Sequence, residues 1–169
     1  RGLSLPLAPV MRPTPYYEQT ALSQATWVRI RDKLGKEVRV ESHDEELHVR
    51  VVPGAIRAAL AKLVENAAEV SPVGQPVLVL VSHKVDRAVI EVVDRGPGLP
   101  DEVRQRLFSP HVTTKVGGSG MGLFLARQLV VGMHGGMLEI EDGEGGGTVA
   151  TVILPLAGTE PSRGATDGD

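Results

Sequence analysis

Four short clusters of polar residues and glycines follow one another along this 169-residue chain, and each offers groups that could bind part of a polar ligand. The first is Glu65-Asn66-Ala67-Ala68-Glu69, late in a segment with helical apolar periodicity. The Asn66 side-chain oxygen is a hard, neutral ligand of the kind that magnesium accepts beside water and phosphate oxygens. Taken alone, this asparagine is better interpreted as part of a helix end at which nearby backbone groups satisfy its amide.

The second cluster is Asp94-Arg95-Gly96-Pro97-Gly98, at the end of an apolar run. An aspartate in this place faces the interior of the fold and must find a hydrogen-bond donor there. The exocyclic amine of adenine is one such donor, and Gly96 and Gly98 would let a flat ring approach the backbone closely. The alternative is a common Asp-Gly turn without a function.

The third and fourth clusters favour phosphate. In the segment from Leu107 to Lys115, two threonine hydroxyls and one ammonium group suit contacts with phosphate oxygens. The glycine-rich loop from Gly117 to Leu123 runs into an apolar-periodic helix, whose N-terminal amides would attract an anion. Its spacing matches neither the Walker-type loop nor the three-glycine dinucleotide loop.

In this order, the clusters resemble the N box, first glycine box, F box and second glycine box of the ATP-binding domain of bacterial sensor histidine kinases. That domain belongs to the superfamily of gyrase, Hsp90, histidine kinase and MutL ATPases. Gly146-Gly147-Thr148 also resembles the start of the terminal strand, whose threonine supports the adenine site. The resemblance covers about residues 37–155. It implies the Bergerat fold, an α+β two-layer sandwich with a mostly antiparallel sheet, and a lid over ATP from about Pro97 to Gly117.

The resemblance also implies roles for individual residues. Asp94 would accept a hydrogen bond from the adenine amine, and Asn66 would bind Mg2+. Lys115 and the backbone amides of Gly120 to Leu123 would bind the phosphates. The complete set expected to bind ATP is Lys62, Asn66, Glu69, Asp94, Gly96, Gly98, Thr113, Thr114, Lys115, Gly118, Ser119, Gly120, Met121, Gly122, Leu123 and Thr148.

Three residues depart from the family pattern. Lys62 lies one helical turn before Asn66, where the hydrolysing members of the superfamily carry a glutamate base. An ammonium group holds its proton at neutral pH, so we expect Lys62 to contact phosphate and ATP hydrolysis to be slow. His111 occupies a position that is usually aromatic and Met121 one that is usually leucine, and both bear on packing of the lid.

Composition narrows the function classes. A net charge of −3 argues against a dedicated nucleic-acid binder, and the absence of cysteine excludes disulfides and zinc–thiolate sites. No apolar run is long enough to span a membrane, so we expect a cytoplasmic domain without membrane contact. We predict a linker at residues 1–17, an ATPase domain at 18–156 and a disordered tail at 157–169.

Apolar periodicity predicts the elements that must position the four clusters. Helices are expected from Glu18 to Leu34 (ended by Gly35), from Pro53 to Val70, over Asp101 to Phe108 and over Leu123 to Val130. Two short strands are expected at Val38–Val40 and Leu47–Val51, and hairpins at 77–83 with 88–93 and at 137–140 with 148–154.

The leading hypothesis is a sensor kinase domain that donates the ATP γ-phosphate to a histidine on a dimerisation domain outside this chain. Its partners would be that domain and a response regulator, with a monomeric fragment and a homodimeric full-length protein. His43 sits beside acidic residues but lacks the proline of an acceptor box, and a hairpin-turn histidine is the better interpretation. The alternatives are a stand-alone serine kinase of the anti-sigma-factor type and a non-catalytic nucleotide-sensing module.

Overall fold

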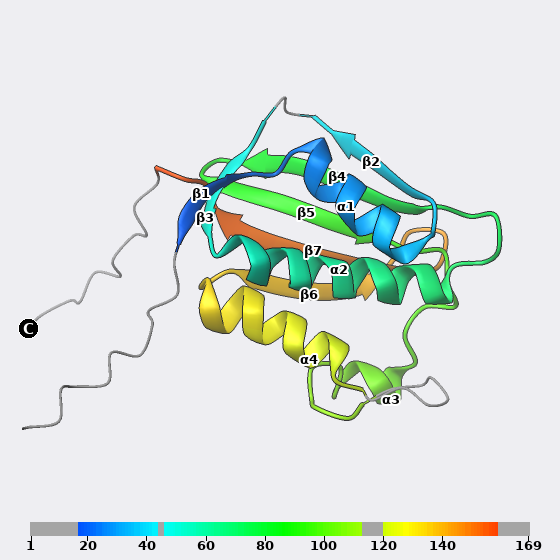
Figure 1. The fold of residues 1–169 in the computed structure, drawn as a ribbon. Coiled ribbons are helices and arrows are strands. Elements are labelled where there is room, and N and C mark those ends of the chain that lie inside the picture. Colours follow the sequence, from blue (N-terminus) through cyan, green and yellow to red (C-terminus); the bar gives the residue numbers. More distant parts are fainter. Residues whose placement is uncertain (1–16, 44–45, 113–119, 159–169) are drawn as a thin grey trace, which may run out of the picture.

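The computed structural model describes residues 17–43, 46–112 and 120–158. Its centre is a five-stranded sheet in the order β2-β4-β5-β7-β6. The strands are β2 (Val38–Ser42), β4 (Val77–Lys84), β5 (Arg87–Val93), β6 (Met137–Asp142) and β7 (Thr148–Pro155). Within this sheet β2 pairs with β4 in parallel and the other pairings are antiparallel. Helices α1 (Gln24–Leu34), α2 (Pro53–Val70) and α4 (Gly122–Arg127) lie on one side of the sheet (Figure 1), which confirms the predicted α+β sandwich.

Helix α2 forms the middle of the helical layer. Pro53 stands in its first turn, where a missing amide proton costs nothing. Its buried residues recur at helical spacing: Ile56, Ala59, Leu60, Leu63, Val64, Ala67 and Ala68. They pack with fully buried strand residues such as Val79, Ile90 and Val152 into one aliphatic core. The end of α2 that carries Asn66 is therefore held firmly against the sheet.

The helix predicted from Glu18 begins later than expected. Residues Glu18–Ala21 form strand β1, which pairs antiparallel with β3 (His48–Val51), and α1 starts only at Gln24. The apolar residues from Ala21 onward fit a helical stripe, but the backbone groups of β1 find their partners some 30 positions away in β3. The predicted end is confirmed, since Gly35 has a left-handed backbone (φ 62°) and its amide bonds the Arg31 carbonyl at 3.0 Å.

The segment around His43 is not a hairpin, which corrects the interpretation of His43 as a hairpin-turn residue. The strands before and after it belong to different sheets, since β2 lies beside β4 while β3 pairs with β1. The backbone amide of His43 instead extends the β2–β4 pairing by bonding the Val81 carbonyl at 3.2 Å. His43 therefore follows the edge strand of the large sheet.

Two helices also differ from their predicted lengths. Helix α3 (Asp101–Arg104) is shorter than predicted and continues as turns. Helix α4 begins at Gly122, one residue before the predicted start at Leu123, and passes into a π-helical segment, η1 (Gln128–Met133). At the end of η1, His134 Nδ1 lies 2.6 Å from the Leu129 carbonyl, and its Nε2 accepts the Val52 amide at 3.0 Å. These bonds tie η1 to the junction between β3 and α2.

Both hairpins are confirmed, as β4–β5 and β6–β7. In the part of the chain that the structure describes, no helix combines the length and the apolarity that a membrane crossing requires.

Candidate nucleotide-binding site

Asp94 follows the end of β5 and is the one buried polar or charged residue among those described, with 4% of its surface exposed. Its Oδ1 accepts the Gly96 amide at 2.8 Å and the Thr148 amide at 3.1 Å. The Thr148 hydroxyl donates to Oδ2. A carboxylate has about four acceptor positions, so these three bonds leave room for one more donor.

Close backbone packing between β5 and β7 holds this carboxylate in place. The Asp94 amide donates to the Thr148 carbonyl at 3.0 Å. A Cβ on Gly147 would lie 2.1 Å from the Asp94 carbonyl oxygen, and Gly147 also has φ +76°. Gly96 is less tight, since a Cβ there would lie 2.8 Å from Val70 Cγ2, a side-chain atom. The close approach of the two strands beside Asp94 therefore requires a glycine at position 147.

The Asp94 side chain opens into a cavity of about 360 Å³. Its walls are mostly aliphatic and come from three places in the chain. The sheet contributes Val92, Ile140 and Ala150; helix α2 contributes Leu63, Ala67 and Val70; the segment after the first glycine box contributes Leu99, Pro100, Val103, Leu107 and Val112. A flat apolar ring with one polar edge fits such a cavity, the edge facing Asp94.

Part of the cavity wall is polar. Lys62, Glu65, Asn66 and Glu69 of α2 line it, opposite Gly120, Gly122 and Leu123 at the start of α4. A Cβ on Gly122 would lie 3.8 Å from Asn66 Nδ2 and 3.8 Å from Lys62 Cδ, so the two helices meet closely here. Lys62 Nζ pairs with Glu65 Oε2 at 3.3 Å. Amides in the first turn of a helix have no acceptor within it, which makes this part of the wall suitable for phosphate oxygens.

Most of the predicted site residues that the structure describes meet in this cavity: Lys62, Asn66, Glu69, Asp94, Gly98, Gly120, Gly122, Leu123 and Thr148 all line it. Gly96 and Met121 do not. The Gly96 amide donates to Asp94 Oδ1. Met121 is the N-cap residue of α4, and its carbonyl oxygen accepts the Leu125 amide at 2.9 Å. The predicted residues Thr113, Thr114, Lys115, Gly118 and Ser119 lie outside the described residues.

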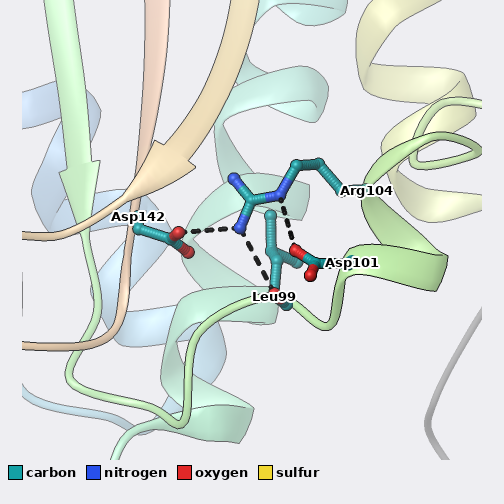
Figure 2. Close-up of polar contacts among 4 residues, drawn as sticks. All are labelled: Leu99, Asp101, Arg104 and Asp142. Atoms are coloured by element: carbon teal, nitrogen blue, oxygen red, sulfur yellow. Dashed lines mark hydrogen bonds and ion pairs between the residues drawn. The ribbon is translucent and has the colours of Figure 1, made fainter.

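Sequence reasoning missed an arginine beside the cavity (Figure 2). Arg104 of α3 reaches Asp142 at the end of β6, with Nη2 2.7 Å from Oδ2. The three-residue spacing of Asp101 and Arg104 predicts an ion pair between these two residues, which the structure has at 3.8 Å. Nothing local in the sequence points to Asp142.

Comparison with known proteins agrees with this geometry. Residues 51–158 match the family described as histidine kinase-, DNA gyrase B-, and HSP90-like ATPase. The chain belongs to this ATPase family. The match includes Asn66, Asp94, the second glycine box and Thr148, so the cavity lies inside the matched ATPase domain. Domains of this family bind ATP.

Among curated proteins, the chain is 43% identical over 102 residues to the C4-dicarboxylate transport sensor protein DctS of Rhodobacter capsulatus, covering 60% of this chain and 15% of that protein. It is 32% identical over 148 residues to the sensor protein kinase PmrB of Pseudomonas aeruginosa, covering 82% of this chain and 31% of that protein. Among solved structures, a mycobacterial sensor histidine kinase, MprB, superimposes with a TM-score of 0.72 at 26% identity, covering 83% of this chain and 98% of that one.

These similarities confirm the predicted family and fold: this is the ATP-binding catalytic domain found in two-component sensor histidine kinases. The chain spans less than a third of the length of either curated relative.

Proposed function

We propose that this domain binds Mg2+–ATP and transfers the γ-phosphate to a histidine on a dimerisation domain outside this chain. The observation that carries the proposal is the buried Asp94 carboxylate, held by Thr148 and Gly96 in a mostly aliphatic cavity that also has a polar wall formed by α2 and the start of α4. The proposed domain spans residues 18–156, with residues 1–17 as a linker and 157–169 as a tail.

The adenine ring would occupy the apolar part of the cavity, with its amine donating to Asp94. Three donors already orient the carboxylate, so it needs no rearrangement to accept the fourth. A base with a carbonyl in place of the amine would bring its oxygen, an acceptor, against the Asp94 carboxylate, also an acceptor. The buried carboxylate would then lack its fourth donor, which weakens binding. Selection for adenine follows from this arrangement.

The triphosphate would extend toward Lys62, Asn66 and the first turn of α4, where cationic and amide donors can bind its oxygens. Among the described residues, no three His, Asp or Glu side chains are grouped to hold a metal ion. One protein oxygen suffices for Mg2+, because it prefers several waters and phosphate oxygens as its other ligands. The Asn66 amide oxygen fits this role, and Mg2+ when bound would neutralise charge on the phosphates.

Transfer needs a nucleophile in line with the bond that breaks. A histidine nitrogen would attack the γ-phosphorus, the bond to the β–γ bridging oxygen would break, and ADP would leave. This chain would supply positioning and charge stabilisation, while the partner domain supplies the nucleophile. A response regulator would then receive the phosphoryl group.

Incubation with γ-labelled ATP tests the proposal. The chain alone is expected to remain unlabelled, and the separately produced upstream region of the parent protein should become labelled on histidine when the chain is added. At an ATP concentration below saturation, Asp94→Asn should strongly reduce this labelling and His43→Ala should not affect it. Strong labelling of the chain alone, lost in His43→Ala, would overturn the proposal, and acid-stable labelling of a serine on a partner would identify an anti-sigma-type kinase instead.

A further inference from the structure

Arg104 makes three contacts with separate parts of the chain (Figure 2). Its Nη2 donates to Asp142 Oδ2 at 2.7 Å and lies 3.3 Å from the Leu99 carbonyl oxygen, while Nε lies 3.8 Å from Asp101 Oδ1. The Arg104 side chain is 38% exposed and that of Asp142 58% exposed, so this is an ion pair at the surface, with a short distance between its partners. One guanidinium thus joins α3, the segment before it and the end of β6.

The end of β6 is the place where this connection affects the nucleotide site. Asp142 is the register partner of Thr148, the residue whose hydroxyl and amide bond Asp94. The backbone of Gly98 also passes close, since a Cβ there would lie 3.6 Å from Asp142 Oδ1 and 3.7 Å from the Gly147 carbonyl oxygen. The Arg104–Asp142 contact therefore holds the segment from Gly98 to Arg104 close to Thr148 and Asp94, the residues proposed to bind adenine.

This segment forms one wall of the cavity. Leu99, Val103 and Leu107 line it, whereas Arg104 itself does not. Leu107, at the far end of this wall, is buried. The part from Leu99 to Arg104 has little burial of this kind, because α3 has only four residues and none of them is buried. An element this short does not hold its own position, so the contacts of Arg104 decide where Leu99 and Val103 stand.

We propose that Arg104 is a positioning residue for the nucleotide base: paired with Asp142, it fixes the Leu99–Leu107 wall against β6–β7 before the nucleotide arrives. The inference rests on the proposed nucleotide site but assigns Arg104 no contact with ATP. Since the wall adjoins the base and not the γ-phosphate, loss of the pair weakens ADP and ATP binding by the same factor. Pre-organising the wall removes the cost of ordering it on binding.

Calorimetry with ADP and with Mg2+–ATP tests this on the whole chain. Arg104→Gln and Asp142→Asn are each expected to raise both dissociation constants about two- to fivefold, the upper part of the range for one well-aligned surface ion pair. The exchanged pair, Arg104→Asp with Asp142→Arg, should recover most of the affinity that Arg104→Asp loses. Arg31→Gln is the matched control, because Arg31 pairs with Asp32 on α1 and lies outside the cavity.

Each outcome decides the proposal. Unchanged affinity in Arg104→Gln would overturn it, as would a loss that the exchanged pair leaves uncorrected or one confined to ATP, which would place Arg104 on the γ-phosphate. Thermal unfolding midpoints close to that of the unaltered chain show that the variants fold; should Arg104→Gln not fold, Asp142→Asn gives the same test from β6. If the unaltered chain bound neither nucleotide, the proposed function would fail first, which is a distinct result.

Discussion

Asp94→Asn probes the adenine site with almost no change of volume. The asparagine oxygen can still accept the Gly96 and Thr148 amides, which now share Oδ1. Its NH2 group then replaces Oδ2, turning an acceptor into a donor at the place where the adenine amine is proposed to bind. The Thr148 hydroxyl can rotate to accept from this group, so the protein side of the network survives.

The expected loss follows from one hydrogen bond to a charged group, worth about 1.5–3 kcal/mol. At about 1.4 kcal/mol per factor of ten, the dissociation constant for ATP should rise about 10- to 150-fold. The same NH2 group can donate to the carbonyl of guanine, so the preference for ATP over GTP should shrink further than the ATP affinity alone implies.

Titration calorimetry with ATP, ADP and GTP measures both effects, and thermal unfolding checks the fold. Asp86→Asn is the matched control, since Asp86 lies in the β4–β5 turn and pairs with Arg87 outside the cavity. An ATP affinity within twofold of the unaltered chain, with the fold intact, would refute the assignment of Asp94 to the base.

Three further results are expected. Gly147→Ala should lower the unfolding midpoint far more than Gly74→Ala. Both glycines have positive φ, but a Cβ at Gly147 meets the Asp94 carbonyl, whereas one at Gly74 meets nothing within 4 Å. Equal losses in the two variants would contradict the close packing at Gly147. Asn66→Ala should weaken ATP binding with Mg2+ present and leave binding in EDTA nearly unchanged; an equal loss in both would remove the metal role. Phosphate release from ATP by the chain alone should stay slow, because Lys62 stands where a base is needed, and rapid release would disprove this.

Local patterns determined much of this protein. The period of α2 appears in its own apolar residues, and the β4–β5 and β6–β7 hairpins join strands that are neighbours in sequence. The chemistry of the site was also readable, because an aspartate after an apolar strand, an asparagine late in a helix and a glycine loop before a helix each imply a role by type and position. Their order along the chain indicated the family before any contact was known.

Only the tertiary structure decided which distant residues meet. The bonds from Thr148 to Asp94 join positions 54 residues apart, and the pair Arg104–Asp142 joins positions 38 apart. The segment Glu18–Ala21, polar except for Ala21, carries no strand pattern of its own and becomes β1 because β3 supplies its hydrogen bonds. Local preference is worth fractions of a kcal/mol per residue, so a distant backbone partner overrides it wherever the segment is short and polar.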